Sequence, residues 1–455
     1  MRSPNAAKWR RLFGKERREL ASSRAWIVLL LVLGPLVGHA FITAVDSYAE
    51  ASGSGGGPAA LAQGLSPLDG IIVPTFGAYA IAVTLLFPFV AIRLVSSEKQ
   101  NGSLKLLLQS PASLGTMLVV KLMLLVVAWV VAWVPGIAAL VLWHFYGGHL
   151  AAPELAGVLL GHVLRATLIC SLAIAAASFT DNAATAAVVT LAVTLGTWAL
   201  DFIAQVRGGL ALMLDAYTPE SALRTFETGE IRVAIVLVTV TLSIACLLLG
   251  IIWLHPGRRL RTRVATSAMV VVAASLLVWL AAQPRTSWDV SEDHRNSFSP
   301  ADERALSSIP APLHVTVYLA PEDPRLADLE RGVLRKLGRT LPRVDVDYAA
   351  TGRGSSGLFA RPGEHYGEVW YAINGRQAMT RSTTEQIVLE TVYGVAGITP
   401  PTNDPEAAYS GYPLVARPVA AAIIFYLIWP CLVVGIWLLT RRTPQLPAPK
   451  KAGRG

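Results

Sequence analysis

Eight apolar runs constrain the fold of this chain more than any other feature. Each run is long enough to cross the roughly 30 Å hydrocarbon layer of a bilayer as a helix. Of 455 residues, 53% are hydrophobic and only 15% are charged, whereas soluble domains carry about a quarter charged residues. The runs lie at Trp26–Val45, Ile71–Leu94, Met117–Trp143, Leu155–Phe179, Ala183–Gln205, Val233–Leu254, Val264–Ala282 and Pro418–Thr440. The sequence therefore predicts an α-helical polytopic membrane protein with about eight transmembrane helices.

The distribution of lysine and arginine predicts how these spans are oriented. Basic residues gather in the N-terminal segment, in the loop His255–Arg263 and in the tail after Arg441, whereas the loop 144–156 has none. With eight spans the three basic segments fall on one side, which the positive-inside rule makes the cytoplasm. We therefore expect a multi-pass protein of the bacterial inner (cytoplasmic) membrane with both termini cytoplasmic. Topology and anionic headgroups account for the net charge of +9, so we expect membrane lipid, and no nucleic acid, as a partner.

The N-terminal segment 1–25 carries an amphipathic pattern. Over residues 8–21, Trp9, Leu12, Phe13 and Leu20 lie near one helical face among six basic residues. Such a helix suits the headgroup region of the cytoplasmic leaflet. A disordered basic tail is the alternative.

The stretch Arg93–Ser113 is a polar, cationic interruption between the second and third runs. Its middle, Glu98–Ser103, is expected to be a turn. The next residues, 104–109, place leucines beside Lys105 and Gln109, which predicts a short amphipathic helix. Pro111 ends that helix because proline lacks an N–H and disfavours α geometry in the preceding residue. The stretch is either a docking element for a soluble partner or a solvated loop on lipid headgroups.

Between the last two runs, the segment 284–417 changes composition and is predicted to be an extracytoplasmic α/β domain. Ser299–Glu303 has the pattern of a capped helix start with proline at the first helical position. His314–Ala320 and Val344–Ala349 are expected to be strands, and Asn374-Gly375 favours the type I′ turn of a hairpin. Helical spacing appears over 324–341 and 383–395. Strand–helix–strand order predicts at least one parallel strand pair.

A search for catalytic chemistry is mostly negative. The sequence has no GxxxxGK[ST], GxSxG or HExxH motif, and the glycine cluster 352–357 lacks the lysine of a phosphate-binding loop. His144 and His149 are a weak metal pattern, and the three cysteines are far apart. We therefore expect no catalytic, cofactor-binding or metal-binding residues in this chain, so any energy source is another polypeptide.

We single out three polar side chains within the predicted spans. Arg165 falls near the middle of the fourth span with His162 one turn away, and Asp201 lies toward the outer end of the fifth. Ionisable groups inside a membrane are costly, which makes a functional role one hypothesis. The alternative is that Arg165 snorkels, or pairs with Asp201 only to join two helices. Two GxxxG spacings, Gly34–Gly38 and Gly157–Gly161, allow close helix contact.

The segment 98–111, EKQNGSLKLLLQSP, resembles the coupling loop of type-2 ABC transporter permeases, which also have a basic N-terminal helix and six spans. The matching residues are Glu98, Gly102, Ser103, Leu104, Leu107, Ser110 and Pro111. Lys105 departs from the pattern, because an acidic residue is common there. The resemblance covers roughly residues 8–255. It implies that the coupling helix, over 93–113, docks a separate ATP-binding subunit that holds ATP and Mg, and that two permeases pair as a homodimer or a heterodimer.

A second resemblance concerns Trp288–Pro300, WDVSEDHRNSFSP. It is similar to the opening of the auxiliary subunit of gliding-motility-type ABC transporters, although Val290 and Phe298 stand where leucines are usual and the domain is shorter. This implies a permease fused to a shortened auxiliary domain that can contact an envelope partner. The expected division is 1–25 interfacial helix, 26–255 permease core, 256–283 basic loop and span seven, 284–417 outer domain, 418–440 span eight and 441–455 basic tail.

Together these features predict the permease subunit of an ATP-driven exporter. The alternatives are a non-transporting membrane anchor whose outer domain binds an envelope protein or sugar, and a membrane-bound enzyme with its site in 284–417. The apolar residues of the spans do not distinguish polysaccharides, lipids, peptides and drugs as substrates.

Overall fold

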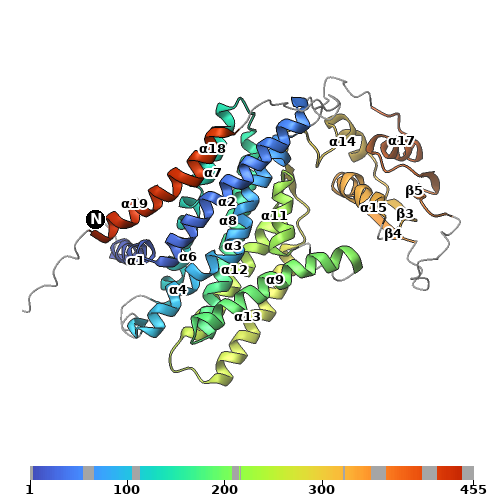
Figure 1. Ribbon diagram of the computed structural model, residues 1–455. Helices are drawn as coiled ribbons and strands as arrows, with labels where there is room; N and C mark the ends of the chain where they lie inside the picture. Colours follow the sequence, from blue (N-terminus) through green and yellow to red (C-terminus); the bar gives the residue numbers. More distant parts are fainter. Residues whose placement is uncertain are drawn as a thin grey trace, which may run out of the picture.

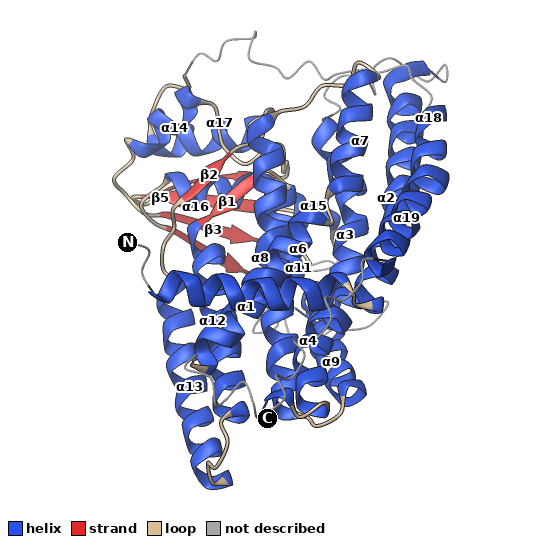
Figure 2. Ribbon diagram, turned by 90° about the vertical axis from the view of Figure 1, so that its left-hand side faces the viewer, coloured by secondary structure: helices blue, strands red, loops and turns tan. Residues whose placement is uncertain are grey.

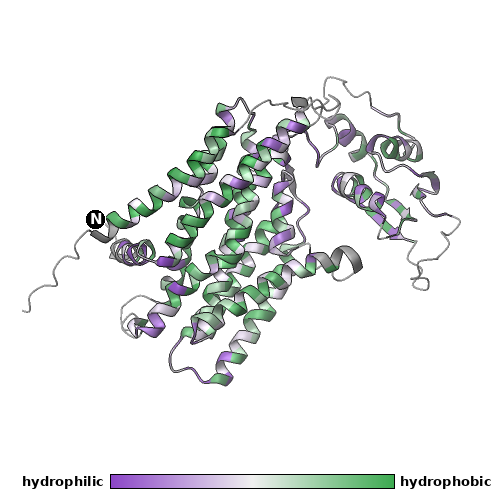
Figure 3. Cartoon of the chain, in the orientation of Figure 1, coloured by the Kyte–Doolittle hydropathy of each residue, from purple (hydrophilic) through white to green (hydrophobic). Residues whose placement is uncertain are grey.

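A bundle of long apolar helices forms the body of the molecule, with a small sheet domain beside one end (Figures 1 and 2). The computed structural model describes residues 4–54, 66–104, 113–207, 215, 217–320, 323–349, 365–401 and 418–442. Within these residues, eight helices are long and apolar enough to cross a membrane. Figure 3 shows hydrophobic residues along the bundle helices and more hydrophilic ones in α1 and the sheet domain. The prediction of an eight-span helical membrane protein with a small α/β region is confirmed.

The bundle begins with α1 and continues through helices that run alternately between its two ends. We call these the α1 end, with α1 and the last turns of α4, and the β1 end, with the short strand β1. Several spans are composite, because π-helical turns (η) or short breaks divide them. The elements are α1 (Pro4–Ala21), α2 (Arg24–Ala49), η1 (Glu50–Ser54), η3 (Leu68–Ile72), α3 (Val73–Leu85), α4 (Phe87–Gln100), α6 (Leu114–Val131), α7 (Val134–Phe145), α8 (Ala152–Phe179), α9 (Ala183–Arg207), α11 (Pro219–Glu227), α12 (Val233–Leu254), α13 (Leu260–Ala281), α18 (Val419–Ile423), η6 (Ile424–Ile428) and α19 (Trp429–Arg442).

The turn expected over Glu98–Ser103 begins later than predicted. The helix α4 continues through Glu98 to Gln100, and the chain turns only at Asn101 and Gly102. Gly102 has a φ of +69°, a left-handed conformation that glycine adopts without steric cost. The glycine ends the helix, whereas the polar residues before it are tolerated in the last two helical turns.

A tyrosine hydroxyl bridges the break between α6 and α7. Pro135 lies in the first turn of α7, and the two backbone groups that an unbroken helix would join there are the carbonyl of Ala132 and the N–H of Gly136. Tyr79, from α3, donates to that carbonyl at 3.2 Å and accepts from that N–H at 2.8 Å. The hydroxyl thus satisfies both backbone groups, which water cannot reach inside a bilayer.

The last span packs against the first through the predicted GxxxG spacing. A Cβ at Gly34 would lie 1.9 Å from the Trp429 ring, and one at Gly38 would lie 2.2 Å from Phe425. The Trp429 indole also donates to the backbone carbonyl of Leu30 at 2.7 Å. The two glycines therefore let the aromatic side chains of η6 and α19 approach the α2 backbone, which joins the two ends of the chain.

The region after α13 contains the strands. The first sheet pairs β1 (Glu230–Arg232) with β2 (Ser287–Asp289) in antiparallel register, and so links the start of α12 to the segment after α13. The second sheet has the order β4-β3-β5-β6. Its region comprises α14 (Pro300–Ser307), β3 (Leu313–Val317), α15 (Pro324–Leu329), η4 (Glu330–Leu334), α16 (Arg335–Thr340), β4 (Val344–Tyr348), β5 (Val369–Ile373), β6 (Arg376–Thr380) and α17 (Glu385–Ala396).

Local signals place most of this region as expected. Ser299 caps α14, accepting a hydrogen bond from the N–H of Asp302. Strands β3 and β4 are parallel, and Asn374 and Gly375, with φ values of 50° and 80°, connect β5 to β6. Alternate residues of β3 and β5 are buried, and they share a hydrophobic core with α14–α17 that is separate from the core of the bundle. The sheet domain thus has its own hydrophobic interior.

Candidate functional site

The predicted docking residue Glu98 lies inside a buried ion cluster at the α1 end. Its side chain is 3% exposed and contacts Lys15 of α1 at 2.5 Å and Lys121 of α6 at 3.1 Å. Lys121, equally buried, also binds Glu16 at 2.7 Å and donates to the carbonyl of Leu94 at 3.0 Å. The Glu98 carboxylate therefore faces the interior, where it joins α1, α4 and α6, rather than the solvent.

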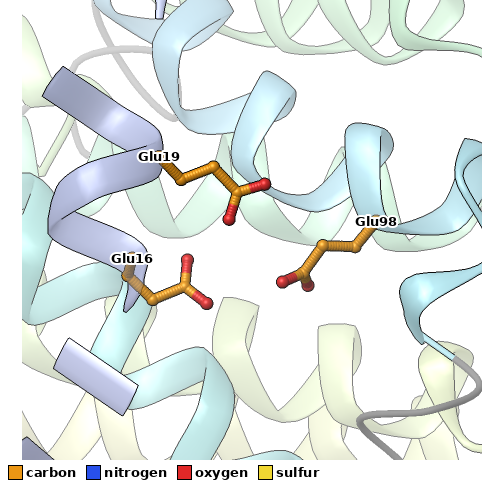
Figure 4. Close-up of side chains that lie close together, drawn as sticks. All are labelled: Glu16, Glu19 and Glu98. Atoms are coloured by element: carbon orange, nitrogen blue, oxygen red, sulfur yellow. The ribbon is translucent and has the colours of Figure 1, made fainter. Parts of the chain in front are cut away.

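A third carboxylate, Glu19, completes this cluster. Figure 4 shows the carboxylates of Glu16, Glu19 and Glu98 directed toward one another, and their nearest oxygens lie within 4.8 Å. The ammonium groups of Lys15 and Lys121 lie among them and supply the counter-charge. Burial raises the pKa of Glu16, Lys121 lowers it in part, and the Glu98 charge raises it further. The cluster therefore holds more carboxylates than ammonium groups, and desolvation makes their charge costly unless both lysines stay in place.

The residues around Glu98 hold the start of the predicted coupling loop. Lys99 reaches the carboxyl end of α8, donating to the carbonyls of Ala177, Ser178 and Thr180 and pairing with Asp181 at 3.6 Å. Cations are favourable at a helix C-terminus, where backbone carbonyls lack partners.

Of the remaining loop residues that match the family pattern, three are described. Gly102 forms the turn, Ser103 donates a long hydrogen bond of 3.5 Å to the carbonyl of Glu98, and Leu104 packs partly against the bundle core. Leu107, Ser110 and Pro111 lie outside the described residues. The loop therefore leaves the bundle from a fixed base formed by α1, α4, α6 and the end of α8.

Arg165, at the middle of α8, and Asp201, in the second half of α9, each find a partner in α11 rather than each other. The guanidinium of Arg165 binds Glu220 at 2.6 Å and Thr84 of α3 at 2.9 Å. Asp201 binds Arg224 through both carboxylate oxygens, at 2.6 and 3.2 Å. The expected Arg165–Asp201 pair is thus replaced by two ion pairs that fasten α11 to α8 and α9.

A small cavity of about 210 Å³ lies beside the Arg165–Glu220 pair. Thr84, Thr194 and the exposed Trp198 contribute to its wall, so the cavity is bounded by both polar and apolar groups. Near it, His162 is fully buried, its ring lies 5.7 Å from that of Phe76, and neither ring nitrogen has a hydrogen-bond partner within the described part of the chain.

A second acidic group of α11, Glu227, is also shielded from solvent. Burial, and next the charge of Glu220, raises the pKa of Glu227 to about 7. Phe226, beside it, packs against Gly161, whose added Cβ would lie 2.7 Å from the phenylalanine side chain. The Gly157–Gly161 spacing therefore accommodates α11 and the segment beyond it rather than another long span.

The Trp288–Pro300 motif forms a turn around Asp289 that binds the β1 end. Asp289 accepts hydrogen bonds from the backbone and hydroxyl of Ser291, from the backbone and side chain of Asn296 and from Ser297. Although burial opposes ionisation, these donors lower the pKa of Asp289. Asn296 also donates to the Thr228 carbonyl at 2.7 Å, so the turn contacts the end of α11.

Two further contacts attach this turn to the start of the spans. The Glu154 carboxylate, at the start of α8, accepts from the backbone N–H of Glu292 at 2.7 Å, and Glu292 contacts His149 at 2.9 Å. Arg295 pairs with Asp69 of η3 as well as with Asp293. The motif that resembles an auxiliary-subunit opening is therefore the junction between the bundle and the sheet domain.

Sequence reasoning missed several residues of these clusters. Lys15, Glu16 and Lys121 were not singled out, and neither were Glu220 and Arg224. One signal was available, since Lys121 is a lysine inside an apolar run and an ionisable residue there needs a partner. Its partners lie 23 and 105 residues away, and only packing brings them together.

The eight spans and the buried ion pairs between them define a multi-pass membrane protein with buried charges at its α1 end and at the middle of α8. Comparison with protein families identifies the model described as "ABC-2 family transporter protein" over residues 10–283. The chain belongs to this family, so it is a membrane-spanning ABC-2 transporter permease, which is distinct from the ATPase. No curated protein and no solved structure matches it.

Proposed function

We propose that this chain is the permease subunit of an ATP-driven exporter and docks a separate ATP-binding subunit at its α1 end. The single observation that carries the proposal is the buried ion cluster at the base of the loop 101–113, in which Lys15 and Lys121 pair with Glu16 and Glu98. It links α1, the second span and the third span beside the segment that resembles a coupling helix. Force applied to this loop would thus move three helices together.

In the proposed cycle, this ion cluster transmits movement of the loop to the helices that it connects. Closure of two ATP-loaded partner subunits pushes the loops of two paired permeases, as a homodimer or with a paralogue, and tilts their spans as rigid bodies. The ion pairs Arg165–Glu220 and Asp201–Arg224, which fasten α11 to α8 and α9, separate in this cycle as the outer path opens. On this proposal, ATP and Mg bind the partner subunit.

The proposed orientation places the α1 end in the cytoplasm of the bacterial inner membrane. Both α1 and the end of α19 lie at this end, as does the basic loop between α12 and α13, which agrees with the positive-inside rule. On this topology the sheet domain is extracytoplasmic and acts as a shortened auxiliary domain that binds an envelope partner.

The test is co-purification of the tagged chain with an ATPase in mild detergent. We expect an ATPase to co-purify with the wild type and to be lost with Leu104→Arg and Leu107→Arg, because a charge at an apolar docking residue opposes burial. The control is Leu260→Arg, at the start of α13, which places the same charge at an exposed residue at the same end. An ATPase that is retained by the loop variants contradicts the docking site, and absence of any ATPase contradicts the exporter.

A further inference from the structure

A cavity of about 550 Å³ opens at the α1 end, away from the ion cluster. Three spans meet there. The first turn of α2 contributes Ala25, and the first turn of α9 contributes Ala183 and Ala184. The residues of α4 form a stripe from Phe89, in its first turn, to Asn101, which follows its last residue. On the topology proposed above, this is the headgroup level of the cytoplasmic leaflet.

The wall of the cavity changes from apolar to polar along α4. Phe89, Arg93, Ser96 and Gln100 recur every three or four residues, so they lie on one face of the helix. Phe89 is the deepest of these residues in the span, and the polar residues lie progressively closer to the end of α4. A ligand that fits this stripe has an apolar part within the membrane and a polar group at its edge.

Two polar groups of this wall have no partner within the described part of the chain. Ser96 is 3% exposed, and its buried hydroxyl has no hydrogen-bond partner there. Arg93, which is exposed, has no carboxylate within ion-pair distance among those residues, whereas Lys15, Lys99 and Lys121 all have one. A guanidinium and a buried hydroxyl are thus both available to an incoming acceptor.

The backbone adds positive potential to the same cavity. Ala25 and Ala183 lie in the first turns of α2 and α9, where the helix dipole favours an anion, and at α9 the N–H of Ala184 donates to the Asn182 side chain. Together with Arg93 and Ser96, these ends favour an anionic group with several oxygen acceptors, such as a phosphate.

We propose that this cavity binds the phosphate-bearing headgroup of an anionic lipid from the cytoplasmic leaflet, and that anionic amphiphiles are the class that the exporter moves. Arg93 binds the phosphate, Ser96 donates its hydroxyl, and the acyl chain lies along Phe89. This inference rests on the proposed function for the transport step, whereas binding at the cavity stands independently of it.

The experiment titrates the purified full chain with phosphatidylglycerol, phosphatidylcholine and inorganic phosphate, and follows binding by native mass spectrometry. We expect phosphatidylglycerol to bind and Arg93→Gln to weaken it about tenfold, as the loss of one charged hydrogen-bonding group predicts. Ser96→Ala is expected to weaken it less, and Arg93→Lys to restore part of it. Equal binding of phosphatidylcholine contradicts an anion site, and equal binding of inorganic phosphate contradicts an amphiphile.

The matched control is Arg18→Gln, which removes an exposed arginine of α1 that does not line the cavity. If Arg18→Gln weakens binding as much as Arg93→Gln does, the lipid only adsorbs to a basic surface and the inference is wrong. Each variant must elute from size-exclusion chromatography as the wild type does. If Arg93→Gln does not fold, Arg93→Lys, which keeps the charge, is compared with the wild type instead.

The transport part is measured as ATP hydrolysis by the co-purified complex. We expect phosphatidylglycerol to stimulate hydrolysis, measured per co-purified ATPase, in the wild type and not in Arg93→Gln. Binding without stimulation overturns the substrate class. If no ATPase co-purifies while phosphatidylglycerol still binds at Arg93, the proposed function fails and the lipid site stands.

Discussion

At the residue scale, Glu98, which the sequence predicts to be a docking residue, is buried and ion-paired in the fold. Its sequence neighbours are polar and basic, which suggested a solvated turn. In the fold, Lys15 and Lys121 neutralise it, and Glu16 shares Lys121. A carboxylate this deeply buried is tolerated because its counter-ions are buried with it.

Substitution of Lys121 tests how much this cluster contributes to the free energy of unfolding. Lys121→Met leaves Glu16 and Glu98 with Lys15 as their shared cation, so we expect a loss of about 3 to 5 kcal/mol in the free energy of unfolding, the usual result of breaking a buried pair. Denaturation in detergent measures it. The triple variant that also carries Glu16→Gln and Glu98→Gln should recover much of the loss, and a Lys121→Met protein as stable as the wild type contradicts the cluster.

Glu227 predicts a pH dependence of stability. Its pKa in the fold is about 7, against about 4.3 when unfolded. Below the unfolded value both states are protonated. As pH rises toward 7 the unfolded state loses its proton first, so stability falls across this interval and then levels off. We expect Glu227→Gln to reduce the difference in Tm between about pH 5 and about pH 8, whereas the exposed Glu390→Gln keeps the wild-type difference.

At the scale of elements, two spans are broken next to a proline, whereas α2 continues through Pro35. Pro88 follows the irregular Leu86 between α3 and α4, and Pro135 follows the break between α6 and α7. At the second break the compensation is one hydroxyl, that of Tyr79. The position of a break is thus local, and its repair depends on another helix.

Tyr79→Phe keeps the ring and removes the hydroxyl between Ala132 and Gly136. Because two buried backbone groups then lose their partner, we expect a destabilisation of about 1 to 3 kcal/mol. Tyr371→Phe is the matched control, since its buried hydroxyl has no partner among the described residues. Thermal unfolding of the two variants compares them, and equal Tm values speak against the bridging role.

At the scale of the whole molecule, the turn around Asp289 positions the sheet domain on the bundle. It joins the ends of three elements, since Thr228 follows α11, Glu154 begins α8 and Asp69 belongs to η3. These contacts, and the pairing of β1 with β2, connect segments that lie far apart in the sequence. The sheet domain is therefore attached to the bundle through its first residues.

Asp289→Ala removes the acceptor at the centre of this turn. Several donors then lose their charged partner, each such bond contributing roughly 1.5 to 3 kcal/mol, so β2 should separate from β1 more often. We expect amide hydrogen exchange at Glu230–Arg232 to accelerate at least about tenfold while the spans stay protected. Asp347→Ala, an exposed aspartate of β4, controls for loss of charge. Unchanged exchange at β1 rules out the role of the turn.

The sequence by itself determined the spans, the hairpin at Asn374-Gly375, the Ser299 cap and the parallel strand pair, because hydrophobic length, φ preference and capping act over a few neighbouring residues. Tertiary structure decided which charges meet. Glu98 has Lys15 and Lys121 as partners, and Arg165 has Glu220 rather than Asp201. An ion pair depends on which helix faces lie together, and these partners are separated by 23 to 83 residues, beyond the reach of any local pattern.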